Sequence, residues 1–300
     1  MLSRTGWIAV ALASAFVVLT AGCSSDGASG ASPGSSAAAS STDSGPRDSG
    51  PGMYLALGDS VPFGFRGAAM AEFSDPANFV GYPELVGAEL GLEVVNASCP
   101  GETTASFMDT TAQSNGCENS LQLGFGYRTA YPLHVPYESA DQSQLDFAVD
   151  TLIDDEDVEL VTLQIGANDA FLCQQTKPSR CSDAADVEAL AQTREANVDR
   201  ILSTLRGEGG YDGQIVVVTY YALDYADAFG GVTLDLAPGI AEVAEANGAD
   251  VADGYRAFEQ VANEAGGDSV EAGLVLPDDV HPTEKGQRLL ADAVTAVVDD

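Results

Sequence analysis

Residues 53–60 have the sequence Met-Tyr-Leu-Ala-Leu-Gly-Asp-Ser. A short apolar run that ends at a glycine is typical of a buried strand, here 53–57. The glycine permits a tight turn, which would present Ser60 at the end of that strand. Taken alone, Ser60 is better explained as the N-cap of a helix. Whether Ser60 has a structural or a chemical role therefore depends on the motifs that follow in the sequence.

Strand and helix patterns alternate along the rest of the chain. Buried-strand patterns occupy 92–97, 160–165 and 215–220, and a last short strand begins at Val251. Helical spacing of apolar residues occupies 82–90, 144–153, 187–205, 240–246 and 289–298. Residues 100–137 show no clear period and are interpreted as a long loop. Strands separated by helices imply a mostly parallel sheet with helices on both faces, in a single α/β domain over 53–300.

Three short polar motifs follow predicted strands, at the sheet edge where ligands bind in such folds. The first ends in Ser60, the second contains Gly101 within 96–103, and the third contains Asn168 within 166–169. A glycine can offer an unhindered backbone N–H to a developing negative charge, and an asparagine can offer its NH₂ group. Each motif alone is better explained by a structural role, as a loop glycine or a helix cap.

A fourth motif, within 278–282, contains His281 just before the last predicted helix. Asp278 lies three residues before His281, so one turn of chain can bring its carboxylate to the imidazole. Asp279, two residues away, is the alternative. His134 lies in a loop rich in Tyr and Pro without a neighbouring carboxylate, so we interpret it as a surface or structural residue.

The four motifs together, in this order and at these strand ends, resemble the SGNH hydrolases, also called GDSL-family esterases and lipases. Ser60, Gly101, Asn168 and His281 stand where the four name-giving residues of that family stand. The first motif continues with Val61 where the family has leucine. The resemblance covers about 53–298, and the second motif with its local cysteines is similar to an exported actinobacterial branch.

The resemblance implies a three-layer α/β/α sandwich with a flavodoxin-like central sheet. It implies Ser60 as nucleophile, His281 as general base and then acid, and Asp278 as the carboxylate that orients the imidazole. The Ser60 N–H, the Gly101 N–H and the Asn168 side chain would form the oxyanion hole. A neutral serine needs such a base, and a tetrahedral intermediate needs such donors. No metal or organic cofactor is required, and we expect a monomer.

The charge of the chain narrows the possible partners. Its 300 residues include 12 Lys and Arg against 46 Asp and Glu, which gives a formal net charge of −34. Such acidity excludes a generic nucleic-acid binder, because neutralising phosphates requires basic side chains. It also disfavours adhesion of the folded domain to anionic lipid. Any membrane association is expected through the N-terminus.

The N-terminus resembles a bacterial lipoprotein signal. Arg4 precedes an apolar run to about Leu19, and small residues then lead directly to Cys23. The run is too short for a comfortable membrane span, so residues 1–22 are interpreted as a signal peptide and Cys23 as the lipidated residue. Ordinary signal cleavage is the alternative. Residues 24–52 contain no large apolar side chain, so 23–52 are expected to form a flexible tether.

Four further cysteines remain, Cys99, Cys117, Cys173 and Cys181. An even number of cysteines in an exported chain suggests disulfides. Three pairings are possible, and the two sequence-local pairs are the simplest. The alternative is a zinc site, although the chain lacks the C-x₂₋₄-C pairs that zinc ligands usually form.

The expected substrate is a small-molecule, lipid or glycan ester, cleaved at the outer face of the cell membrane or after secretion. Esterases, lipases and carbohydrate deacetylases all fit the same four motifs, as does an acyltransferase with an alcohol acceptor. A non-catalytic surface lipoprotein that binds a ligand is the alternative from another class.

Overall fold

The core of the fold is a parallel sheet. The computed structural model describes residues 51–226 and 237–298, and in this part the strands are β1 (Met53–Gly58), β2 (Glu93–Asn96), β3 (Val158–Gln164), β4 (Gln214–Val218) and β5 (Asp250–Ala252). They are ordered β2-β1-β3-β4-β5, and all neighbouring strands are parallel. Leu55 is in register with Val95 of β2 and with Val161 of β3. This is the flavodoxin-like order.

The longer helices are α2 (Tyr82–Leu90), α4 (Gln144–Asp154), α5 (Ala167–Thr176), α6 (Ala184–Gly207), α7 (Ala237–Ala246), α8 (Gly254–Ala262) and α9 (Glu284–Thr295). Single turns of helix occur at α1 (Ser60–Phe63) and α3 (Tyr127–Ala130). Short 3₁₀ segments occupy η1 (Glu72–Ser74), η2 (Pro76–Asn78) and η3 (Asn263–Ala265).

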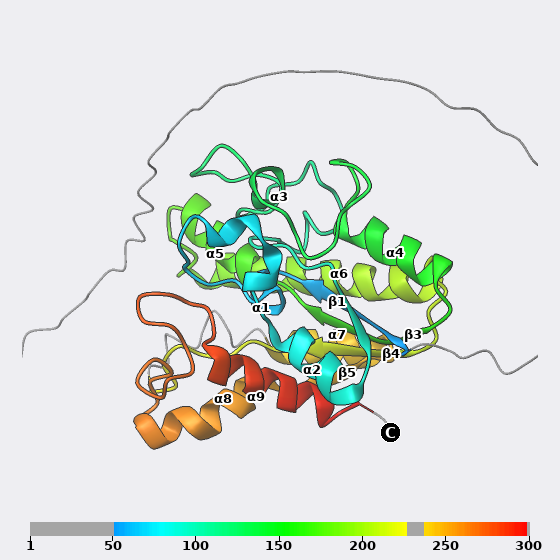
Figure 1. Cartoon of the computed structure of the whole chain (residues 1–300). Helices are drawn as coiled ribbons and strands as arrows, with labels where there is room; N and C mark the ends of the chain where they lie inside the picture. The colour runs from blue at the N-terminus through cyan, green and yellow to red at the C-terminus, as the bar shows by residue number, and fades with distance from the viewer. Residues whose placement is uncertain (1–50, 227–236, 299–300) are drawn as a thin grey trace, which may run out of the picture. The chain divides into compact units, whose positions relative to one another are not determined.

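Helices cover both faces of the sheet (Figure 1). Side chains alternate along a strand, so Leu55 and Leu57 face one side while Tyr54 and Ala56 face the other. The first side packs against α4, α6 and α7, and the second against α2, α8 and α9. Both layers are almost fully buried, with Leu57 and Tyr54 both at 0% exposure. The expected three-layer α/β/α sandwich is therefore confirmed.

The sheet order places a natural ligand site at one edge. From β1 the chain first runs to β2 on one side and later to β3 on the other. In open parallel sheets, ligands bind at the carboxyl ends of the strands where the order reverses. Residues Gly58–Ser60 leave the end of β1, and Gly166–Asn168 follow the end of β3. Two of the four sequence motifs thus meet at this point.

The structure adds elements that the sequence analysis did not assign. Residues 167–176 form α5 immediately after the third motif, and 254–262 form α8. A single helical turn, α3, lies within the stretch expected to be a loop. Residues 1–22, Cys23 and most of the expected tether lie outside the described residues. Pro51–Asp300 forms its own compact unit. Within the described part of the chain, no helix has the length and apolar character needed to cross a membrane.

Candidate active site

Ser60 is placed by the turn that ends β1. It is the first residue of α1, and the preceding Asp59 caps this helix by accepting a hydrogen bond from the Val61 N–H at 3.0 Å. The first N–H groups of a helix have no partner within it, so the Ser60 N–H is left available for another acceptor. The N-cap explanation therefore applies to Asp59, and Ser60 carries its hydroxyl beyond the sheet edge.

His281 lies in the loop that leads into α9. Its Nε2 is 2.9 Å from Ser60 Oγ, although the two residues are 221 positions apart in the chain. The loop is fixed on both sides of the ring: the Tyr221 hydroxyl donates to the Val280 carbonyl at 2.6 Å, and Leu276 N–H donates to the His281 carbonyl at 3.0 Å. The imidazole is therefore held against the serine hydroxyl by contacts that do not involve the ring itself.

The carboxylate that contacts His281 is that of Asp279, and the expectation of Asp278 is corrected. Asp279 Oδ1 is 2.6 Å from His281 Nδ1 and also accepts from the Val280 N–H at 2.6 Å. Asp278 is exposed and has a left-handed backbone, with φ of 58°. This turn tightens the chain by one residue relative to the expected single turn. Asp279 is consequently the residue whose side chain reaches the imidazole.

The charge on Asp279 selects which ring nitrogen of His281 faces it with a hydrogen. Partial burial would raise the pKa of Asp279, but the hydrogen bond with His281 and the histidine charge outweigh it and lower the pKa to about 2. An ionised carboxylate can only accept, so a neutral His281 carries its proton on Nδ1 and donates it to Asp279. Nε2 is then the acceptor of the Ser60 hydroxyl proton.

Asp59 is a second carboxylate next to the serine. It is 1% exposed, and burial raises its pKa to about 6 although hydrogen bonds from Tyr220 and Val61 oppose this. One of its oxygens accepts from the Tyr220 hydroxyl and also from Asn168 Nδ2, the latter at 3.3 Å. Asp59 therefore links the turn that carries Ser60 to the third motif.

Gly101 and Asn168, the other two expected donors, are joined by a third residue. Gly101 has φ of +87°, and a Cβ there would lie 2.6 Å from Gly116 Cα, so only glycine fits. The Gly101 carbonyl accepts from the Asn115 N–H at 2.8 Å. Asn115 Nδ2 in turn donates to Asn168 Oδ1 at 2.9 Å. The structure thus brings all four name-giving positions into one connected set.

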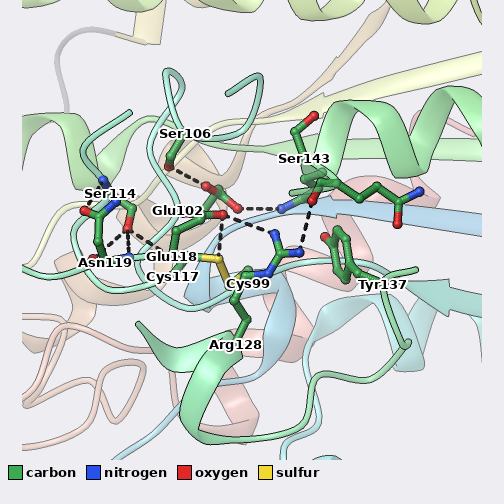
Figure 2. A network of polar contacts seen from close by, with 12 residues as sticks. Cys99, Glu102, Ser106, Ser114, Cys117, Glu118, Asn119, Arg128, Tyr137 and Ser143 are labelled. Atoms are coloured by element: carbon green, nitrogen blue, oxygen red, sulfur yellow. Dashed lines mark hydrogen bonds and ion pairs between the residues drawn. A yellow bond between two sulfur atoms is a disulfide. The ribbon is translucent and has the colours of Figure 1, made fainter. Parts of the chain in front are cut away.

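A buried polar network supports the loop that follows Gly101 (Figure 2). Glu102 is fully buried, so its pKa is raised by desolvation and by the neighbouring charge of Glu118. Glu118 pairs with Arg128 at 3.4 Å. Gln144 Nε2 donates to Glu102 at 3.2 Å, and Gln144 Oε1 accepts from the Gly58 N–H at 2.6 Å. The network therefore ties the second motif to the end of β1.

Two disulfides join the sequence-local pairs, Cys99–Cys117 and Cys173–Cys181. The first spans the Gly101 loop and the segment that lies against it (Figure 2). Ligand-type atoms of Cys99, Glu102 and Cys117 lie within 4.8 Å of one another. Both sulfur atoms, however, are bonded to each other. The disulfide interpretation is therefore preferred to the zinc alternative.

An aromatic cluster lies beside the imidazole. The Phe65 ring is 5.0 Å from the His281 ring, measured between centroids. Phe65 packs against Phe73, Phe79 and Tyr127, with centroid distances of 5.9 to 6.1 Å. His134 belongs to the same region as a structural residue, since its Nε2 is 3.0 Å from the Phe63 carbonyl.

Several residues around the site had no individual signal in the sequence. Asn115 and Tyr220 contact Asn168 and Asp59 through side chains brought from distant segments. Gln144 was expected only as the first residue of a helix. Phe65 follows the first motif closely, but nothing local shows that its ring faces a histidine 216 positions later. The only sequence feature that pointed to these contacts was the richness of 100–137 in small polar residues.

Comparisons with known proteins agree with this fold. A phospholipase A1 from Streptomyces albidoflavus superposes with a TM-score of 0.52 and 18% identity, covering 83% of this chain and 100% of that one. An acetylxylan esterase from Geobacillus stearothermophilus gives a TM-score of 0.51 and 19% identity, covering 82% and 93%. At these identities the likeness establishes the fold alone. A search of curated protein sequences finds no match.

The class of protein follows from fold and sequence together: this is a carboxylic ester hydrolase with an SGNH-type α/β fold. More narrowly, the sequence profile of the GDSL-like lipase/acylhydrolase family matches residues 56–289. The chain belongs to that family.

Proposed function

We propose that the protein hydrolyses carboxylic esters through Ser60, His281 and Asp279. The observation that carries the proposal is the continuous contact from Ser60 Oγ to His281 Nε2 and from His281 Nδ1 to Asp279 Oδ1. A hydroxyl, an imidazole and a carboxylate in this order form the triad of serine hydrolases, in which the imidazole takes the serine proton and the carboxylate orients and stabilises the imidazole.

In the proposed reaction, Ser60 Oγ attacks the ester carbonyl carbon while its proton passes to His281 Nε2. Asp279 stabilises the imidazolium that results. His281 then gives the proton to the leaving alcohol as the carbon–oxygen bond breaks and an acyl-serine forms. A water molecule, deprotonated by the same imidazole, releases the acid and restores Ser60.

The negative charge of the tetrahedral intermediate would fall on the former carbonyl oxygen. We assign its stabilisation to the Ser60 N–H, the Gly101 N–H and Asn168 Nδ2. Asn168 Nδ2 carries two hydrogens, and Asp59 takes one of them. The second remains for the oxyanion. Such fixed donors are effective because they require no reorganisation during the reaction.

The aromatic cluster favours esters with an apolar acyl or alkoxy group. A substrate bound to Ser60 Oγ would lie near the half-buried Phe65 ring, which is 5.0 Å from the His281 ring and packs against Phe73 and Phe79. Burying one methylene group gains about 0.8 kcal/mol. We therefore expect kcat/KM to rise with chain length from acetate towards medium-chain acids.

The test is hydrolysis of p-nitrophenyl esters from acetate to palmitate by residues 51–300, which contain the whole described core. Ser60→Ala should lose at least about 10⁴-fold in kcat. The matched control Ser203→Ala, at an exposed position of α6, should retain full activity. Hydrolysis by Ser60→Ala at the wild-type rate would refute the assignment.

The chain-length profile tests the apolar site separately. Phe65→Ala should flatten the profile and leave acetate hydrolysis nearly unchanged. A wild-type preference for acetylated carbohydrate over every p-nitrophenyl ester would contradict the apolar assignment. Transfer of the acyl group to added alcohols at the expense of hydrolysis would identify an acyltransferase.

We also propose that the enzyme is exported and attached through a lipid on Cys23, with residues 1–22 removed as a signal and 23–52 acting as a tether. The sequence pattern before Cys23 supports this proposal. The two disulfides add support, because they are typical of proteins that leave the cytosol.

A further inference from the structure

A chain of side-chain amides leads from the surface into the active site. Gln122 Nε2 donates to Gln175 Oε1 at 3.3 Å, and Gln175 Nε2 donates to Asn115 Oδ1 at 2.8 Å. Asn115 Nδ2 donates to Asn168 Oδ1 at 2.9 Å, and Asn168 Nδ2 donates to Asp59 Oδ2 at 3.3 Å. Gln175, Asn115 and Asn168 each accept on the oxygen and donate from the nitrogen, and Gln122 donates from its nitrogen. All four dipoles therefore point the same way, towards Asp59.

The carboxylate at the end fixes this direction. Asp59, when ionised, has no hydrogen to give, so Asn168 must face it with Nδ2. A flipped Asn168 would place Oδ1 against the carboxylate and would leave the Asn115 NH₂ group facing another NH₂ group. Both mismatches leave polar groups without partners in a site where Asn168 is only 5% exposed. The second hydrogen on Asn168 Nδ2 is thereby directed towards the proposed position of the oxyanion.

Asn115 contacts both arms of the proposed oxyanion hole. Its side chain binds Asn168, and its backbone N–H donates to the Gly101 carbonyl at 2.8 Å. The next residue, Gly116, lies directly against Gly101. The Cys99–Cys117 disulfide closes the same pair of segments. The position of Asn115 therefore couples the two donors to each other.

We propose that Asn115 is a positioning residue for ester hydrolysis, which orients the Asn168 amide through its side chain and the Gly101 loop through its backbone. The inference rests on the proposed roles of Gly101 and Asn168. Oxyanion donors act only when they are held in place before the charge develops. Asn115 itself would touch neither the substrate nor Ser60.

A double-mutant cycle separates positioning from loop stability. Asn115→Ala removes the side-chain contact but keeps the backbone N–H that holds Gly101. We expect kcat for a p-nitrophenyl ester to fall about 10- to 100-fold, with KM changed less than about three-fold. In an Asn168→Ala background, the same substitution should cost less than about three-fold, because its target is gone.

Two further variants test whether the side-chain contact between Asn115 and Asn168 is responsible. Asn115→Asp keeps the shape and the acceptor for Gln175 but loses the donor to Asn168, so it should be at least as impaired as Asn115→Ala. Asn119→Ala is the matched control. Asn119 lies in the same loop and also makes side-chain hydrogen bonds, to Ala112 and Ser114, but none to Asn168. Its effect on kcat should be small and equal in both backgrounds.

The side-chain amide signal of Asn168 gives a readout that does not require turnover. It can be assigned in a ¹⁵N–¹H NMR spectrum as the signal missing from Asn168→Ala. It should shift in Asn115→Ala and stay in place in Asn119→Ala. An unmoved signal, or a loss of kcat that is the same with and without Asn168, overturns the proposal. If the proposed function itself is wrong, the wild type will be no more active than Ser60→Ala. That outcome differs from a failure of the Asn115 proposal alone.

Discussion

Replacing Asp279 with asparagine keeps the size of the side chain but removes the charge that faces His281 Nδ1. The amide can also turn its NH₂ group towards Nδ1. The imidazole would then carry its proton on Nε2, the atom that must accept the Ser60 proton. The substitution is therefore expected to reduce turnover both by loss of charge and by selection of the wrong tautomer.

The structure bounds the size of the loss. The pKa of Asp279 is lowered from 3.8 to about 2 despite its partial burial, which corresponds to about 2 kcal/mol in favour of the ionised form. Asp279 is 23% exposed, so solvent screening leaves about 1 kcal/mol, or roughly five-fold in rate. A wrong tautomer costs far more, about 10⁴-fold in known triads. The expected loss in kcat lies between these limits, and its size shows which effect dominates.

The assay is kcat for a p-nitrophenyl ester, measured for wild type, Asp279→Asn and Asp278→Asn. The last variant is the matched control, because Asp278 is exposed and asparagine tolerates its left-handed backbone. Asp278→Asn should remain within about two-fold of wild type. Since Asp279 is ionised well below neutrality, its own titration should not contribute to the pH dependence of wild-type kcat above about pH 5. An impaired Asp278→Asn beside an unimpaired Asp279→Asn would refute the reasoning.

Two further predictions concern cysteines. Cys117→Ser opens a crosslink between residues 18 positions apart, which should cost about 3 kcal/mol of stability. It should also reduce kcat at temperatures well below the Tm, because the Gly101 loop loses a support. A lower Tm with unchanged kcat at low temperature would contradict that role. Cys23→Ser should release the protein from the cell membrane, and a wild-type mature protein whose mass shows no lipid on Cys23 would contradict lipidation.

The architecture was largely predictable from periodicity. The strand expected at 53–57 is β1, because a short continuous apolar run ends there at a glycine. The helix expected at 82–90 is α2, because its apolar residues recur at helical spacing. Helix α5 was not assigned because its buried face is formed by Asn168, Ala170 and Cys173, which give little apolar signal. Helix α8 is amphipathic but only nine residues long.

The positions of Ser60, Gly101 and Asn168 were also predictable, since parallel strands release their following residues at one edge of the sheet. His281 was predictable from its place just before the last helix, in the motif order of the family. The choice between Asp278 and Asp279 was not. Both lie close enough to His281 along the chain, and the left-handed turn at Asp278 decides between them.

The sequence by itself determined the chemistry available to this protein: a serine, a histidine and amide donors at strand ends, in an acidic α/β domain. These features are local, because they depend on residue type and on short periods along the chain. The tertiary structure alone decided which carboxylate faces His281, that Phe65 lies beside the imidazole, and that Asn115 joins Gly101 to Asn168. Contacts of this kind unite segments up to 221 residues apart, as for Ser60 and His281. They depend on backbone turns and side-chain packing that no short stretch of sequence encodes.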